Sequence, residues 1–138
     1  MDNQILFTIL ILSLIAILFV MARVNTLRVP AKKKEKIQSK LEELKVQIDR
    51  DDTYAIRDAI IKLDNLLSKA LQIRYRNDLS CGDNLKKAKK LFRKDKYQEI
   101  WDVHKMRNEI VHKDKEIGYD TAQSAYKVYK MAINRIVK

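Results

Sequence analysis

The sequence predicts an all-α protein in which one N-terminal apolar helix precedes an up-and-down four-helix bundle. The 138 residues include only two Gly and one Pro, too few for the turns of a β-sandwich or barrel. Residues 5–22 carry no charge, and beyond them apolar residues recur every three or four positions, as in helices with one buried face. The remaining chain can form one modest core, which excludes a multidomain enzyme.

The apolar segment 5–22 is the first of these elements. At ~1.5 Å per residue it extends roughly 27 Å, enough for the hydrocarbon core of a bilayer. The alternative is a cleaved signal peptide, which has a basic N-terminal region, a shorter apolar core and a small-residue cleavage site. Here residues 1–4 read Met-Asp-Asn-Gln and the core is long. We therefore expect a single transmembrane helix at 5–22, with residues 1–4 as a short tail outside the cytoplasm.

Basic residues follow this segment and predict its orientation. The positive-inside rule places them, and everything after residue 23, on the cytoplasmic side of the inner membrane. They can also contact anionic headgroups, each contributing about 1 kcal/mol, although a topology signal alone is the simpler interpretation. The flanking residues are Arg23, Arg28, Lys32, Lys33 and Lys34, followed by Lys36 and Lys40.

Overall charge and the metal-binding residue types narrow the classes of partner. Twenty-nine Lys and Arg against 18 Asp and Glu give a formal charge of +11, which favours nucleic acid or an anionic lipid surface. A single cysteine, Cys81, excludes an internal disulfide and a multi-cysteine metal site. His104 and His112 are eight residues apart with no apparent third ligand. We expect no metal and no cofactor.

Pro30 marks a joint after the membrane segment, because it cannot continue a helix. The next segment is highly charged, apart from a narrow apolar seam of the coiled-coil kind. Two heptads leave two interpretations open, a short dimer stalk or a helix docked on the domain. We treat residues 23–50 as a basic juxtamembrane segment with a linker helix. The seam consists of Ile37, Leu41, Leu44 and Ile48.

The helical domain is expected over residues 51–138. Asp49 to Thr53 provide a break with good N-cap residues. Apolar faces then predict four packed helices, with residues 79–83 as a loop. These helices are expected at 52–77, 84–95, 97–113 and 119–137.

The second of these helices is strongly basic. Such a helix suits the phosphate backbone of nucleic acid, and a solvated surface is the equally weighted alternative. Its basic residues are Lys86, Lys87, Lys89, Lys90, Arg93 and Lys94.

Arg107 is out of place on the third predicted helix. At 100° per residue it falls inside the apolar arc that contains Ile100 and Ile110, whereas His104, Asn108 and His112 lie on the adjoining polar face. A guanidinium is almost never buried without a partner. Asp64 lies on the inner face of the preceding long helix and is the best internal candidate. An Asp64–Arg107 pair can be purely structural.

The stretch Arg107-Asn108-Glu109-Ile110-Val111-His112 resembles the signature of the HEPN superfamily of helical nucleotide-binding domains. In that signature, an Arg and an adjacent polar residue are followed by a His after four to six residues. The penultimate-helix position and the domain size also match over about residues 51–138. The stretches DAIIKLDNLLSKAL and WDVHKMRNEIVH look like small HEPN-like domains tethered behind one membrane helix in bacterial proteins.

The resemblance implies metal-independent RNA cleavage that leaves a 2′,3′-cyclic phosphate. An imidazole suits proton transfer, and a guanidinium suits the charge that develops on phosphate. Carried over, Arg107 is the phosphate clamp, His112 the general acid and base, and Asn108 a hydrogen-bond positioner. Asp64 as an orienter of Arg107 is our inference from helix geometry.

Geometry qualifies this expectation, because a five-residue step places Arg107 and His112 about 140° and ~7.5 Å apart on a straight helix. They can meet at one phosphate if the helix loosens near Lys113 or if two subunits share a cleft. HEPN nucleases commonly act as dimers, so the resemblance implies a homodimer. Inactive HEPN domains serve as dimerisation modules, which leaves a non-catalytic interaction module as the alternative function.

Overall fold

The structure is a computed structural model that describes residues 2–26 and 28–138. Every regular element in these residues is helical, as expected. The elements are α1 (Asn3–Thr26), α2 (Ala31–Ile48), α3 (Thr53–Tyr75), α4 (Cys81–Lys87), the 3₁₀ helix η1 (Ala88–Leu91), α5 (Lys94–Lys113) and α6 (Tyr119–Ile136).

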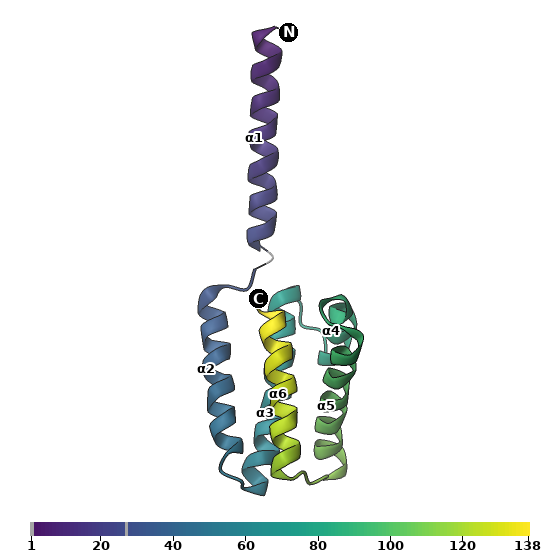
Figure 1. Cartoon of the computed structure of the whole chain (residues 1–138). Helices are drawn as coiled ribbons and strands as arrows, with labels where there is room; N and C mark the ends of the chain where they lie inside the picture. The colour runs from purple at the N-terminus through teal and green to yellow at the C-terminus, as the bar shows by residue number, and fades with distance from the viewer. Residues whose placement is uncertain (1, 27) are drawn as a thin grey trace.

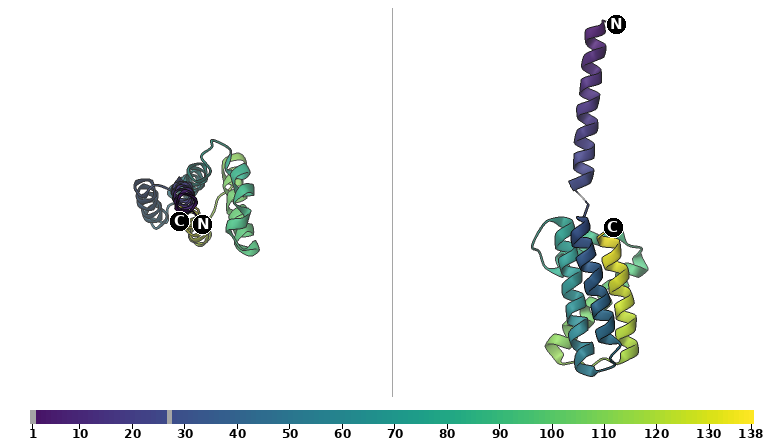
Figure 2. Two further views of the ribbon diagram at one scale, coloured as in Figure 1. Left: turned by 90° about the horizontal axis from the view of Figure 1, so that it is seen from above. Right: turned by 90° about the vertical axis from the view of Figure 1, so that its left-hand side faces the viewer.

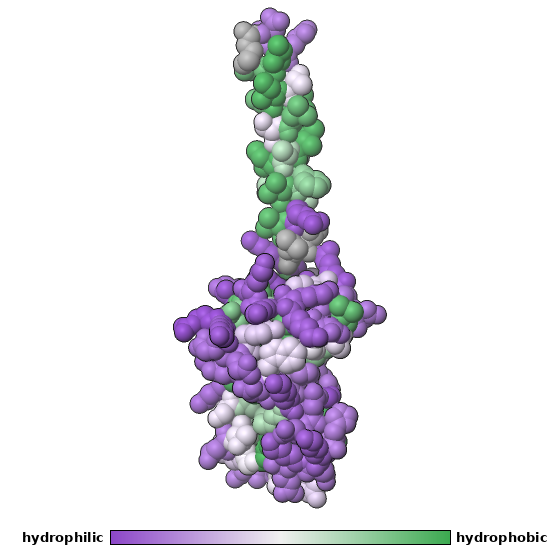
Figure 3. Space-filling view, turned by 90° about the vertical axis from the view of Figure 1, so that its right-hand side faces the viewer, coloured by the Kyte–Doolittle hydropathy of each residue, from purple (hydrophilic) through white to green (hydrophobic). Residues whose placement is uncertain are grey.

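Helix α1 stands apart from the other helices (Figure 1), and it exposes its apolar side chains (Figure 3). It extends beyond the predicted 5–22 at both ends. The hydroxyls of Thr8 and Ser13 donate to the backbone carbonyls of Gln4 and Ile9, so neither leaves an unsatisfied group on the apolar surface. Among the described residues, α1 is the one helix long and apolar enough to cross a membrane, a criterion that a signal sequence also meets.

The other long helices, α2, α3, α5 and α6, run up and down in a bundle. Viewed along α1, α3 and α6 lie in the middle, with α2 on one side and α5 on the other (Figure 2). Helix α4 and η1 lie at the end of the bundle nearest α1 (Figure 1). Tyr129 and Leu63 are among the largest fully buried side chains of the core that the helices share.

Helix α2 resolves the two interpretations of the apolar seam. All four seam residues are buried in the core, none exposing more than 4 % of its surface. Tyr126 on α6 donates a hydrogen bond to the Leu41 carbonyl oxygen, which ties α2 to the bundle. The seam is therefore docked on its own chain and not free to form a dimer stalk. The bundle begins at Ala31, and the boundary we placed at residue 51 falls inside it.

The second domain helix differs from the prediction. Residues 81–83, expected in a loop, form the first turn of α4, and the expected helix 84–95 ends at Lys87 and tightens into η1. Ser80 caps α4: its Oγ accepts from the Asp83 amide at 3.1 Å and donates to the Asp83 carboxylate at 2.7 Å. Phe92 is extended, so α5 begins at Lys94, three residues earlier than expected.

Truncating the docked seam tests the packing of α2. We expect Leu44→Ala to lower the free energy of unfolding of the chain in detergent micelles by 2–5 kcal/mol, because Leu44 is fully buried. Val46 on the same helix is 60 % exposed, and Val46→Ala should change stability by no more than about 0.5 kcal/mol. Equal and small effects in chemical denaturation would show that α2 is not part of the cooperative core.

Candidate functional site

Asp64 is the centre of the site. It lies in the middle of α3, among the apolar residues that form the buried face of that helix. Its residue surface is only 3 % exposed, and Asp64 and Asn84 are the two buried polar residues in the part of the chain that the structure describes. A buried carboxylate is stable only with partners, and three side chains from α5 and α6 lie around it.

Tyr129 of α6 and His104 of α5 both contact the same oxygen of this carboxylate. The Tyr129 hydroxyl lies 3.1 Å from Asp64 Oδ1 and 3.1 Å from the Val103 carbonyl oxygen, so it can donate to either. His104 Nδ1 lies 2.9 Å from Asp64 Oδ1, and the tautomer with hydrogen on Nδ1 donates to this carboxylate oxygen. Burial, reinforced by Asp64, raises the pKa of Tyr129 well above its usual value, so the hydroxyl remains a donor.

Arg107 lies on the other side of the carboxylate. Its Nε is 3.7 Å from Asp64 Oδ2, so the expected pair is present as an ion pair without a hydrogen bond. Nε is buried and has no hydrogen-bond partner among the described residues. The terminal nitrogens reach neutral amides: one donates to Asn108 Oδ1 at 3.1 Å, the other to Asn65 Oδ1 at 3.4 Å. About a quarter of the Arg107 side chain, 23 %, is exposed.

His112 does not join this group. It is exposed in the last turn of α5, and it forms no hydrogen bond or ion pair with the described residues. The imidazole that shares a carboxylate with Arg107 is that of His104. His104 also packs edge to face on Trp101, with 5.8 Å between the ring centroids. Within one chain, the predicted trio is reduced to Arg107 and Asn108.

Cys81 brings a third potential metal ligand to the cluster. Ligand atoms of Asp64, Cys81 and His104 all lie within 4.8 Å of one another, although they are distant in sequence. This corrects our argument that no further ligand could assist a histidine. A Cys, a His and a carboxylate suit zinc, but the Asp64 oxygens already face two donors and the Arg107 cation, which would repel a metal ion. We assign the cluster as a hydrogen-bonded network.

The predicted nucleic-acid-binding residues begin on α4, the helix whose first residue, Cys81, belongs to this cluster. They are exposed on α4, η1 and the start of α5, at the end of the bundle nearest α1 (Figure 1). Lys94 opens α5 and His112 closes it, so the two are roughly 27 Å apart along the helix. Lys86 and Arg93 form ion pairs with Asp83 and Asp95. The basic surface and the predicted catalytic histidine therefore lie at opposite ends.

The sequence argument missed His104, Cys81 and Tyr129 as members of the Asp64 cluster. One signal was present: His104 and Arg107 are three residues apart, so they face the same neighbour on α3. For comparison with known proteins, searches with this chain found no matching family model, no similar curated protein and no similar solved structure.

The pH dependence of stability tests the burial of Cys81. Burial first, then Asp64, raises the pKa of the Cys81 thiol to about 12 from its usual 9.0. The unfolded thiol ionises above pH 9 while the folded thiol does not, so stability is lost as pH rises from 9 towards 12. Between pH 8 and pH 10, we expect the wild-type chain to lose about 1 kcal/mol more than Cys81→Ala. Parallel curves in denaturant titrations would contradict burial of the thiol.

Proposed function

We propose that this protein is a membrane-tethered helical interaction module in which Arg107 is structural. In this proposal α1 is a single membrane anchor, the bundle lies on the cytoplasmic side, and the domain acts by binding at the membrane face. The basic residues on both sides of the α1–α2 connection support this orientation, through the positive-inside rule.

The observation that carries the proposal is the occupied Asp64 carboxylate. The groups best suited to chemistry near Arg107 are committed to it: Nδ1 of His104 lies 2.9 Å from the carboxylate and the Tyr129 hydroxyl 3.1 Å from it. Their shared partner ties α3, α5 and α6 together, as a fold-stabilising network would. The side chain that the HEPN resemblance makes the general acid and base, His112, lies outside the network.

A metal-independent endoribonuclease is the second candidate, and one observation favours it. Among the described residues, the terminal nitrogens of Arg107 donate only to the neutral amides of Asn65 and Asn108, so the exposed part of the guanidinium can still bind a phosphate. Catalysis would then need His112 close to Arg107, in a homodimer with paired motifs. The docked α2 seam removes the structural argument for that dimer, which leaves the HEPN resemblance as its support.

An RNA cleavage assay separates the two functions. We expect the chain in detergent micelles, incubated with single-stranded RNA in EDTA, to leave the RNA intact. His112→Ala should leave the melting temperature unchanged, because His112 is exposed, whereas Arg107→Ala should lower it by removing the only cation beside Asp64 among the described residues.

The contrary result is equally specific. Fragments ending in 2′,3′-cyclic phosphate that are produced by the wild type and disappear in both His112→Ala and Asn108→Ala would establish the ribonuclease and refute the non-catalytic module. Lys105→Ala serves as the matched control, since this residue is exposed on the same helix and forms no ion pair with the described residues.

A further inference from the structure

Four segments that are distant in sequence meet at the end of the bundle nearest α1. Gln38 of α2 donates to Asn134 of α6 at 2.6 Å. Arg74 of α3 donates to the carbonyl oxygen of Ile136 at 2.7 Å, and Arg135 donates to that of Leu91 at 3.1 Å. These bonds hold the start of α2, the end of α3, η1 and the end of α6 in one surface.

This surface, which we name the basic end, carries a marked excess of positive charge. Its acidic residues are few, among them Glu35, Asp78 and Asp83. Nine of its lysines are exposed and form no ion pair with the described residues, so their charges are uncompensated. They are Lys32, Lys33, Lys34 and Lys36 on α2, Lys69 on α3, Lys87 on α4, Lys89 and Lys90 on η1, and Lys94 on α5.

The opposite end of the bundle is different in charge. Its connections, residues 49–52 and 114–118, contain more acidic than basic residues. Two cations near it are neutralised, in the ion pairs Arg57–Asp114 and Lys115–Glu109, both at 2.6 Å. The excess positive charge is therefore concentrated at the end that adjoins α1.

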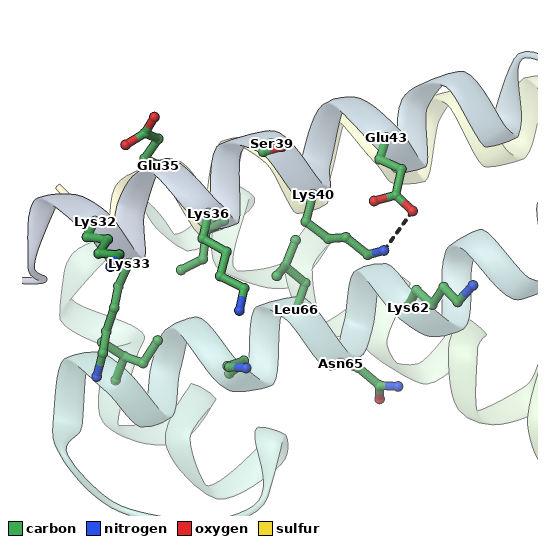
Figure 4. Close-up of a pocket in the computed structure, with 13 residues that line it drawn as sticks. Lys32, Lys33, Glu35, Lys36, Ser39, Lys40, Glu43, Lys62, Asn65 and Leu66 are labelled. Carbon is green, nitrogen blue, oxygen red and sulfur yellow. Dashed lines mark hydrogen bonds and ion pairs between the residues drawn. The ribbon is translucent and has the colours of Figure 1, made fainter.

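A groove between α2 and α3 opens within the basic end (Figure 4). Its volume is about 990 Å³, and Ile37, Leu66 and Ile73 give it an apolar part. In its half nearer α1 the lysines are unpaired, and Lys33 and Lys36 extend from α2 towards α3 (Figure 4). Further from α1, Lys40 and Lys62 are neutralised by Glu43 and Asp58. The uncompensated positive charge of the groove therefore lies in the half next to α1.

We propose that the basic end binds the phosphate headgroups of anionic phospholipids in the membrane that α1 spans, with Lys33, Lys36 and Lys69 holding a headgroup in the α2–α3 groove. This inference rests on the proposed role of α1 as an anchor. Five residue steps join Thr26 to Ala31, at most roughly 17 Å of chain. The anchor therefore holds the basic end beside the lipid surface, whereas a soluble RNA must diffuse to it. Clusters of lysine next to a membrane helix bind anionic lipids in this way.

The test uses the full chain reconstituted into phosphatidylcholine vesicles, with or without phosphatidylglycerol. In a Cys81→Ala background, a fluorophore is attached at Asp78→Cys on the basic end or at Glu116→Cys on the opposite end. A small fraction of the lipids in these vesicles has a quencher attached to the headgroup. We expect quenching at position 78 to rise about two-fold with phosphatidylglycerol and to fall with added salt. Position 116 should show neither change.

Matched charge variants identify the residues responsible. Lys33→Gln, Lys36→Gln and Lys69→Gln together should clearly reduce the response to phosphatidylglycerol, although six of the nine unpaired lysines remain. Lys105→Gln, Lys113→Gln and Lys127→Gln remove the same charge from exposed positions elsewhere and should leave the response intact. Single-stranded RNA should not displace the basic end from anionic vesicles.

Each contrary outcome has its own meaning. Equal quenching with both lipids in a chain that resists carbonate extraction overturns the headgroup proposal and leaves the anchor standing. Release by carbonate overturns the anchor and, with it, this inference. Loss of quenching on addition of RNA assigns the basic end to nucleic acid and overturns the proposal.

Discussion

One buried carboxylate organises this bundle. Asp64 is 3 % exposed, and a charge in that position is tolerated only because α5 and α6 bring donors and a cation to it. Displacing α5 or α6 would leave the carboxylate without its partners. Tyr129 selects the rotation of α6, while His104 and Arg107 select that of α5. Apolar packing alone specifies these rotations less strictly, since similar side chains can replace one another in a core.

The network also bears on function, because it engages His104 and Tyr129, the proton-carrying side chains nearest Arg107, and leaves His112 outside. Asp64 orients His104 through Nδ1, and the other ring nitrogen lies near the start of α4, where a Cβ on Gly82 would be 4.0 Å from it. Positive charge lies elsewhere, at the end next to α1. This separation, with a neutralised interior and a cationic end, suits a domain held against an anionic surface.

Helix faces were predictable from the sequence, but partners between helices were not. The helix expected at 119–137 matches α6 to within one residue, because apolar periodicity depends on one helix alone. The loop predicted at Cys81 and Gly82 was wrong, because Ser80 caps a helix that begins at Cys81 and includes Gly82. A Cβ added at Gly82 would lie 3.6 Å from Trp101. Asp64 and Arg107 were paired correctly because both lie on inward faces. Cys81 and Tyr129 join them through tertiary packing, which no spacing within one helix reveals.

The free energy of unfolding of Asp64→Ala, compared with that of Asn65→Ala, is the most direct test of this account. Removing the carboxylate strands the Arg107 cation and His104 Nδ1, so we expect a loss of about 3 kcal/mol. Asn65, the next residue, is exposed and accepts one 3.4 Å hydrogen bond from Arg107. Asn65→Ala should therefore lower the free energy of unfolding by no more than about 0.5 kcal/mol. Equal stability of the two variants would contradict the central role of the Asp64 network.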